Sequence, residues 1–232
     1  MANQIPNQLP TPYLPGVDYW AEEPTVDSPP PKPRKRPRDY VPTAHEELHK
    51  KLQKTMEVLG SGSYFTVYVD QENPDIVCKA FHGKKTGFSP KVLKPLFSNS
   101  IESYKKVAET RLAVAEIVNP DTVLTDLCIK QKRVINPINP RDDGQIAQIA
   151  KFFEVAYAQK LEMDLQPQNF RADAAGKVFL VDFVEENVGV DILLTKACRA
   201  WVSLCKQNGI TREECTRLLS RLHPTFKMEP LA

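Results

Sequence analysis

The uneven distribution of proline restricts the fold of this chain more than any other feature of its sequence. Eleven of the 20 prolines lie between Pro6 and Pro42. Proline fixes φ and lacks an amide hydrogen, so it interrupts helices and central strands. The same segment has few residues that could form a periodic apolar face, and it therefore cannot bury enough surface to offset its ordering entropy. We expect residues 1–42 to be a disordered tail and the folded part to begin near residue 43.

A run of basic residues occupies positions 32–38 of this tail and reads Lys-Pro-Arg-Lys-Arg-Pro-Arg. Such a run is typical of a nuclear-localisation signal or of a contact with an anionic surface, and it is equally compatible with a solvated basic linker. The chain as a whole has a net charge of +2, which gives no indication of a nucleic-acid ligand.

The remaining composition indicates a water-soluble domain. Hydrophobic residues make up 41% of the chain and charged residues 26%. No apolar run reaches the roughly 18 residues that a membrane span needs, and the N-terminus lacks the pattern of a secretory signal peptide. The five cysteines show no C-x-x-C spacing, so we expect free thiols in a reducing compartment, such as the cytoplasm, and no zinc site.

Short strands and two helices are predicted for residues 43–140. Turn-forming residues separate the first strands, and Gly87, Pro90 and Pro95 predict a loop with at most a short helix over residues 84–100. Asn119 and Pro120 are expected to end the longer helix. The predicted elements are a helix at 43–54, strands at 57–59, 66–70 and 76–81, a helix at 101–118, and strands at 122–129 and 132–138.

Residues 141–232 are predicted to be mostly helical, because their apolar residues recur at helical spacing and Asn208-Gly209 supplies a helix cap. Trp201 is expected in the core. The predicted elements are a helix at 145–161, a short apolar strand at 178–183, and helices at 190–207 and 211–222. We therefore expect an α+β chain, with a five-stranded sheet and one packed helix in its first half and a reduced helical second half.

Four stretches carry residues that suit nucleotide chemistry. Residues 60–68 place two glycines in the turn between two strands, and Lys79 lies in the middle of an apolar strand. A lysine that faces inward there is costly unless an anion meets it. Asp164 and Asn169 are five residues apart, and Asp182 follows thirteen residues later. Their oxygens are ligands of the kind that Mg²⁺ prefers, and one carboxylate could accept a hydroxyl proton.

In this order, the four stretches resemble the glycine-rich loop, the lysine strand, the catalytic loop and the metal-binding loop of protein kinases. They read GSGSYFTVY (60–68), VCKAF (77–81), MDLQPQNF (163–170) and VDF (181–183). The resemblance covers roughly residues 55–190. It implies a truncated two-lobed kinase fold with lobes at 43–140 and 141–232, a monomer, and ATP and Mg²⁺ as cofactors.

The resemblance also assigns a role to each matching position. Asp164 would be the catalytic aspartate, and Asn169 and Asp182 would hold Mg²⁺. Lys79 would hold the α- and β-phosphates of ATP, and Val67 would cover the adenine. The residues whose backbone would approach the phosphates are Gly60, Ser61, Gly62 and Ser63.

The partner of Lys79 in this comparison should be a glutamate on the predicted helix at 101–118. Three glutamates are candidates: Glu102, Glu109 and Glu116. The position of Glu109, eleven residues before Pro120, fits the kinase pattern best, so we choose Glu109.

Several residues differ from the protein-kinase pattern, and these differences indicate a smaller group of kinases. Phe65 stands at the third glycine position, Glu162-Met163 replace His-Arg, Gln166 replaces a lysine, and Val184 replaces the glycine after Asp-Phe. No Ala-Pro-Glu follows, and the remaining chain is too short for an activation segment. A chain with these differences resembles the minimal effector kinases of the OspG and NleH group, which bacteria inject through type III secretion.

That resemblance implies a constitutively active kinase that is directed at Ser and Thr and is secreted into a host cytoplasm as a virulence effector. It further implies a host protein substrate, and ubiquitin or a ubiquitin-loaded conjugating enzyme as a partner. The basic run at residues 32–38 would permit entry into the nucleus.

Two other functions remain open. The first is a pseudokinase, a binding module that has the kinase fold and no catalytic turnover. Gln166 and the missing substrate platform favour it, whereas the presence of all the catalytic positions disfavours it. A small-molecule phosphotransferase of the aminoglycoside or choline kinase type shares the Asp-to-Asn spacing and also lacks the catalytic-loop lysine. The chain leaves little room for the helical insert that forms the acceptor pocket of those enzymes.

Overall fold

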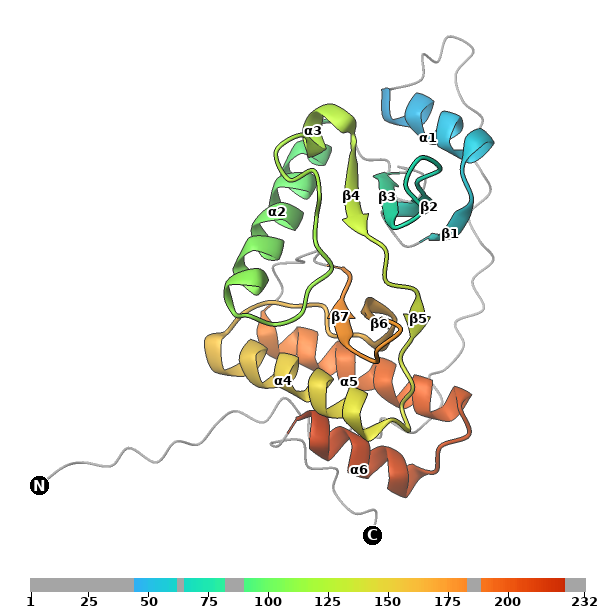
Figure 1. Ribbon diagram of the computed structural model, residues 1–232. Helices are drawn as coiled ribbons and strands as arrows, with labels where there is room; N and C mark the ends of the chain where they lie inside the picture. Colours follow the sequence, from blue (N-terminus) through green and yellow to red (C-terminus); the bar gives the residue numbers. More distant parts are fainter. Residues whose placement is uncertain (1–43, 62–64, 82–89, 183–188, 224–232) are drawn as a thin grey trace, which may run out of the picture. The chain divides into compact units, whose positions relative to one another are not determined.

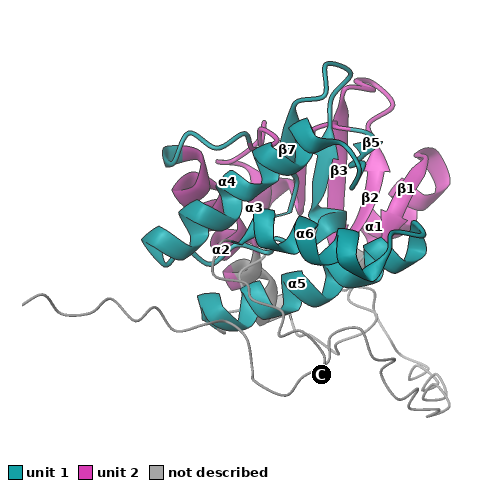
Figure 2. Cartoon of the chain, turned by 90° about the horizontal axis from the view of Figure 1, so that it is seen from below, with its two compact units in different colours: residues 1–21, 109–113, 135–232 teal, residues 22–108, 114–134 magenta. Residues whose placement is uncertain are grey.

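The computed structural model describes residues 44–61, 65–81, 90–182 and 189–223 (Figure 1). The predicted tail with its basic run, Gly62, Ser63 and Val184 lie outside these residues. The described chain divides into two compact units (Figure 2). The part that we call the first unit, drawn in magenta as unit 2 in Figure 2, contains residues 44–108 and 114–134. The part that we call the second unit, drawn in teal as unit 1, contains residues 109–113 and 135–223. Helices and antiparallel strands together confirm the α+β class.

A four-stranded antiparallel sheet forms the centre of the first unit. Its order is β1 (Val58–Ser61), β2 (Phe65–Val69), β3 (Ile76–Phe81) and β4 (Cys128–Lys132). All six residues of β3 are buried, because β3 is central and carries apolar side chains toward both faces of the sheet. The predicted strand at 76–81 is therefore confirmed.

Helix α1 (Ala44–Thr55) covers one face of this sheet. Leu52 and the partly buried Leu48 and Met56 pack in one cluster with sheet residues. The sheet contributes Tyr68, Cys78, Ala80 and Cys128 to the cluster. Cross-strand pairing explains this selection, since Tyr68 lies opposite Cys78 and Ala80 lies opposite Cys128, and directly opposed residues share a face.

The second helix of this unit differs from its prediction. The sequence predicted a loop with at most a short helix over 84–100 and a separate helix at 101–118, whereas one helix, α2, runs from Pro90 to Glu109. Proline suits the first position of a helix, because that residue's amide has no intrahelical partner, so Pro90 begins the helix instead of preventing it. Pro95 is accommodated inside α2. Arg111, with φ of 64°, adopts the left-handed conformation directly after the helix.

The predicted five-stranded sheet is wrong in its last two strands. The sequence predicted strands at 122–129 and 132–138. The first half of 122–129 is instead the short helix α3 (Val123–Asp126), followed by Leu127 with φ of 56°. The fourth strand is β4, and beside it Ile117 forms an isolated bridge with Gln131. Ile117, which was predicted to be helical, therefore pairs with the edge of the sheet.

A buried asparagine determines this connection. Asn119 donates through Nδ2 to Asp126 Oδ2 at 2.9 Å and to the carbonyl of Cys128 at 3.0 Å. Its Oδ1 accepts from the amide of Lys130 at 2.7 Å. Asn119 was predicted to end a helix, and it instead holds α3 against β4. Its side-chain amide pairs with a backbone carbonyl and a backbone amide that would otherwise lack hydrogen-bond partners in this buried loop.

A second, three-stranded sheet belongs to the other unit. Strand β5 (Asn136–Pro137) is the edge strand next to β6 (Phe170–Ala172), and β6 pairs with β7 (Val178–Leu180). The predicted strand at 132–138 is thus divided, since Lys132 ends β4 and β5 pairs in a different sheet. Strand β6 was not predicted, because its three residues directly follow the catalytic-loop motif.

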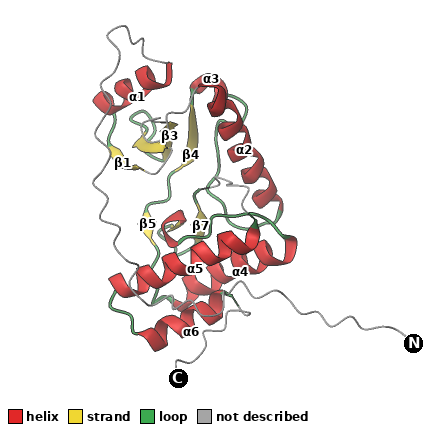
Figure 3. Cartoon of the chain, turned by 180° about the vertical axis from the view of Figure 1, so that it is seen from behind, coloured by secondary structure: helices red, strands yellow, loops and turns green. Residues whose placement is uncertain are grey.

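Three helices pack beside this small sheet: α4 (Asp143–Gln159), α5 (Val190–Gln207) and α6 (Arg212–Leu222). They lie side by side in Figures 1 and 3. Trp201 is fully buried, which confirms its predicted place in the core. Helix α5 has the predicted bounds, and α6 begins after Thr211 with a complete capping box. None of the described helices combines the length and the apolar character that a membrane span requires.

Candidate functional site

The candidate nucleotide-binding residues of the first unit form one row across three strands. Gly60 on β1 lies opposite Val67 on β2, and Val67 lies opposite Lys79 on β3. These residues alternate along the strands with those that pack against α1, so Val67 and Lys79 point to the other face of the sheet. The sheet therefore presents a lysine and an apolar side chain together, next to a strand that carries glycine.

Lys79 is buried, with 8% of its surface exposed. Lysine is rarely buried without compensation, because removing an ammonium group from water is costly unless an anion meets it. The sequence left open whether Lys79 faces inward or outward. The structure resolves this in favour of a buried lysine on the face that α1 does not cover.

Phe65, which stands at the third glycine position of the kinase pattern, has a structural role. It is buried, and its ring lies 6.2 Å from that of Phe81 and 5.9 Å from that of Phe97. Edge-to-face and tilted aromatic pairs at this separation are favourable. The absence of the third glycine thus coincides with an aromatic cluster that connects β2, β3 and α2.

Asp164, Asn169 and Asp182 come together in the second unit. Asn169 ends the 3₁₀ turn η1 (Pro167–Asn169), and its Nδ2 donates to the carbonyl of Asp164 at 3.1 Å. The carbonyl of Asn169 accepts from the amide of Val181 at 2.8 Å. This bond and the pairing of β6 with β7 bring Asp182, the residue after Val181, to the same end of the small sheet.

The electrostatics of Asp164 reflect this crowding. Burial raises the pKa of the Asp164 carboxyl above its usual range, and the negative charge of Asp182 acts in the same direction. Hydrogen bonds from Gln166 oppose the rise in pKa, since its amide donates to Oδ1 at 3.4 Å and its Nε2 to Oδ2 at 3.2 Å. A carboxylate whose pKa is raised is a stronger base than an ordinary aspartate.

Two contacts that sequence reasoning missed hold the segment around Asp164. The indole Nε1 of Trp201 donates to the carbonyl of Leu165 at 3.1 Å, so α5 supports this segment from the core. Glu162 Oε1 accepts from the amide of Gly189 at 2.9 Å. The sequence showed Glu162 only as a departure from the kinase pattern, and no spacing signal relates position 162 to 189 or position 165 to 201.

Glu109 has a different setting from the one predicted. It is the last residue of α2 and is exposed, whereas Glu102 lies within the helix. In the division of the chain, Glu109 groups with residues 110–113 and 135–223, and Lys79 belongs to the other unit. The third candidate, Glu116, forms an ion pair with Lys132 at 2.6 Å. The choice of Glu109 relied on a helix that continued to residue 118, whereas α2 ends at Glu109.

The side chains of Asn169 and Asp182 fit the chemistry of a magnesium site. Because Nδ2 of Asn169 is engaged by the carbonyl of Asp164, the amide oxygen Oδ1 is left for a cation. An amide oxygen and a carboxylate are hard ligands, and Mg²⁺ at a phosphate site needs only one or two protein ligands. Among the described residues, no group of three or more His, Cys, Asp or Glu side chains is placed to hold a metal.

No family model matches the chain, and no curated protein sequence matches it.

Proposed function

We propose that this protein is an ATP- and Mg²⁺-dependent protein kinase. The observation that carries the proposal is the cluster of Asp164, Asn169 and Asp182, in which an amide–carbonyl bond joins the first two and a strand pairing adds the third. The buried Lys79, in register with Val67 and Gly60, supports it from the other unit. Both groups match the kinase motifs in type and order.

Each residue has a defined task in this proposal. When bound, ATP supplies the γ-phosphoryl group and Mg²⁺ neutralises charge on its phosphates. Lys79 Nζ binds a phosphate oxygen, and the backbone of the glycine strand approaches the phosphates. Asn169 Oδ1 and the Asp182 carboxylate hold the cation. The Asp164 carboxylate orients the hydroxyl group of the substrate and accepts its proton, and its raised pKa suits that task.

A phosphotransfer assay on the full chain tests this proposal. Wild type should transfer the γ-phosphate to itself or to a generic protein substrate, and Asp164→Asn should lower the rate by about 10²- to 10⁴-fold. Asp173→Asn is the matched control, because Asp173 only caps the turn before β7 through the amides of Ala175 and Lys177. No transfer by wild type, or equal transfer by Asp164→Asn, would refute the proposal.

Nucleotide binding tests the metal ligands separately. Asp182→Ala should lose the Mg²⁺-dependent part of its affinity for ATP, measured by calorimetry with and without Mg²⁺. An Asp182→Ala protein that binds Mg²⁺-ATP as tightly as wild type contradicts the role of Asp182.

Gln166 favours a second candidate function, that of a pseudokinase. It replaces the lysine of the kinase pattern, and it donates to both carboxylate oxygens of Asp164, the group that must accept a proton. Binding of Mg²⁺-ATP without any transfer to protein would select this function. Labelling of choline or of an aminoglycoside would instead identify a small-molecule phosphotransferase.

We further propose, on the resemblance to type III effector kinases alone, that the substrate is a host protein. Capture of partners from a eukaryotic lysate, with and without ATP, tests this extension. Retention of ubiquitin or of a ubiquitin-loaded conjugating enzyme would extend the resemblance to the partner.

A further inference from the structure

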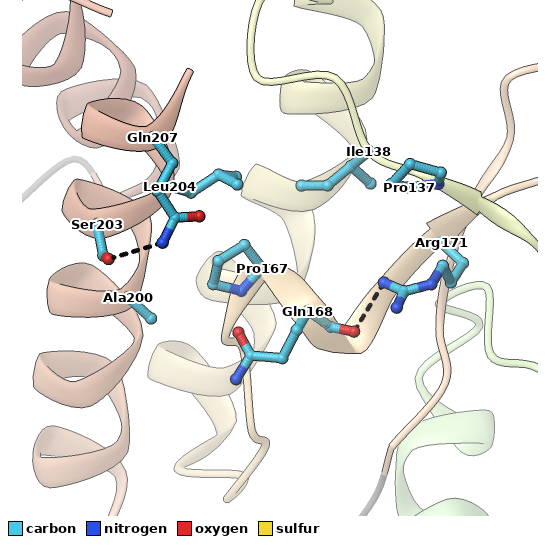
Figure 4. A pocket seen from close by; sticks show the side chains of 9 residues that line it. All are labelled: Pro137, Ile138, Pro167, Gln168, Arg171, Ala200, Ser203, Leu204 and Gln207. Carbon is cyan, nitrogen blue, oxygen red and sulfur yellow. Dashed lines mark hydrogen bonds between the residues drawn. The ribbon is translucent and has the colours of Figure 1, made fainter. Parts of the chain in front are cut away.

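A pocket of about 360 Å³ lies in the second unit, and Asp164 is not among the residues that line it. It is formed between β5, η1, β6 and α5, and Figure 4 shows its lining. Its walls are apolar at Pro137, Pro167 and Leu204 and polar at Gln168, Arg171 and Ser203. This volume lies within the usual range for binding sites of small groups, roughly 300–1,000 Å³.

The residues that line the pocket carry a positive charge and no negative charge. Arg171 is the charged residue of the lining, and none of the lining residues is acidic. Arg171 is half-buried, and its Nη1 donates to the carbonyls of Gln168 and Phe170, both at 2.8 Å. Among the described residues, none of its hydrogen bonds goes to a carboxylate. A guanidinium has five donors in a planar fork, so Nε and Nη2 remain for a ligand.

We propose that this pocket binds an acidic side chain in an extended segment of a partner protein. The guanidinium of Arg171 receives the carboxylate, and the apolar wall from Pro137, Pro167 and Leu204 receives the neighbouring aliphatic side chains. The basis is charge complementarity, because a half-buried cation that lacks an acidic partner is best compensated by an anionic group. The proposal does not depend on kinase activity.

A peptide segment fits this pocket better than a free small anion. The ion pair between a carboxylate and one partly exposed guanidinium strengthens a complex by roughly 2- to 100-fold, whereas a millimolar complex is about 1,000-fold stronger than one with a dissociation constant of 1 M. A free acid would therefore bind weakly at a single arginine. A peptide adds contacts along the stripe of α5 residues at 200, 203, 204 and 207, which line one side of the pocket.

Fluorescence anisotropy with two labelled peptide pools tests the proposal on the full chain. The central residue is glutamate in one pool and glutamine in the other, flanked by equal mixtures of Leu, Val, Ala and Pro. The glutamate pool should bind about tenfold or more tightly than the glutamine pool. Equal affinity of the two pools would overturn the proposal.

Two variants locate the binding. Arg171→Ala should abolish the preference for glutamate. Because Arg171 also holds two carbonyls, Ser203→Glu provides a second variant that leaves Arg171 intact and places a negative charge on an exposed lining residue. It should weaken binding of the glutamate pool by about tenfold or more. Ser220→Glu on α6 is the matched control, since Ser220 is equally exposed and does not line the pocket.

Unchanged preference in Ser203→Glu, with an unchanged melting temperature, would place the binding elsewhere and refute the proposal. A competition arm uses free glutarate. If millimolar glutarate displaces the glutamate pool completely, the ligand is a free small acid and the assignment to a protein segment is wrong. If glutarate fails to compete at that concentration, the peptide assignment stands.

Discussion

Burial makes Asp164 a stabilising group only when it is protonated. Its pKa is raised in the folded state, chiefly by burial. A carboxyl with a raised folded pKa contributes stability fully below its unfolded pKa, and that stability is lost as the pH rises through the folded pKa. Ionisation of Asp164, as the pH rises through its folded pKa, therefore lowers the free energy of unfolding.

We expect Asp164→Asn to raise the melting temperature at pH 7, because the neutral amide avoids the cost of a buried charge. The gain should shrink as the pH falls toward the ordinary aspartate pKa of about 3.9, where wild type is protonated as well. Thermal unfolding between these pH values measures the difference. A wild type that melts at or above the temperature of the variant at pH 7 contradicts this account of Asp164.

Two tyrosines with buried hydroxyl groups offer a comparison. The hydroxyl of Tyr68 lies 2.8 Å from His49 Nδ1, and both residues are buried. The hydroxyl of Tyr157 is buried as well, but it has no hydrogen-bond partner among the described residues. Removing the first hydroxyl breaks a bond, whereas removing the second relieves a desolvated polar group.

We expect Tyr68→Phe to lower the free energy of unfolding by about 1 kcal/mol. Tyr157→Phe should leave it unchanged or raise it. Urea unfolding of the two variants beside wild type measures both changes. Equal losses in the two variants would contradict this account, because the hydrogen bond of Tyr68 would then contribute no additional stability.

At the scale of elements, helix ends with side-chain caps are the best-determined features. Thr211 Oγ1 accepts from the amide of Glu214 at 3.3 Å, and Glu214 Oε2 accepts from the amide of Thr211 at 3.0 Å. The two bonds satisfy amides that have no partner inside α6. The cap is local in sequence, so the start of α6 could be predicted to within a residue.

Thr211→Ala should therefore lower the free energy of unfolding by about 1 kcal/mol. Thr211→Ser keeps the hydroxyl and should retain most of the stability. The measurement is chemical unfolding followed by circular dichroism, with Thr211→Ser as the control. If alanine and serine at position 211 are equally destabilising, the methyl group and not the cap is the source of the loss.

At the scale of the whole molecule, the five cysteines are distributed over both units, so their reactivity measures the exposure of buried residues in each unit. Cys78 and Cys128 lie in the sheet of the first unit, and Cys198, Cys205 and Cys215 lie on α5 and α6 of the second. All five are free and buried, as the predicted reduced thiols require. Burial raises the pKa of Cys198 to about 12, which keeps it in the unreactive thiol form.

We expect no cysteine of the native protein to react rapidly with a thiol reagent at neutral pH. All five should react after denaturation, as counted by mass spectrometry. Ser220→Cys supplies an exposed thiol as the control and should react at once. Rapid labelling of Cys78 or Cys128 in the native protein would show that the sheet of the first unit opens without global unfolding.

Sequence patterns predicted much of the fold because many elements carry local signals. The strand at 76–81 and helix α5 have the predicted bounds, and α4 and α6 differ from prediction by one or two residues at their ends. The failures cluster at residues 90–138. There Pro90 begins a helix, and Asn119 holds a turn through groups on Asp126, Cys128 and Lys130. Those partners of Asn119 lie 7, 9 and 11 residues along the chain, and the bonds to them depend on the backbone path, which no periodicity reveals.

The sequence by itself determined the candidate chemical groups and their order, because residue types and spacings are properties of the chain. Only the tertiary structure decided which of these groups lie together and which are buried. Strand pairing placed Lys79 beside Val67 on the face that α1 leaves uncovered, and η1 with β6 and β7 gathered Asp164, Asn169 and Asp182. Burial then raised the pKa of Asp164 and left Arg171 without an acidic partner in its pocket. Burial and pairing depend on contacts between distant segments, and therefore on the folded chain as a whole.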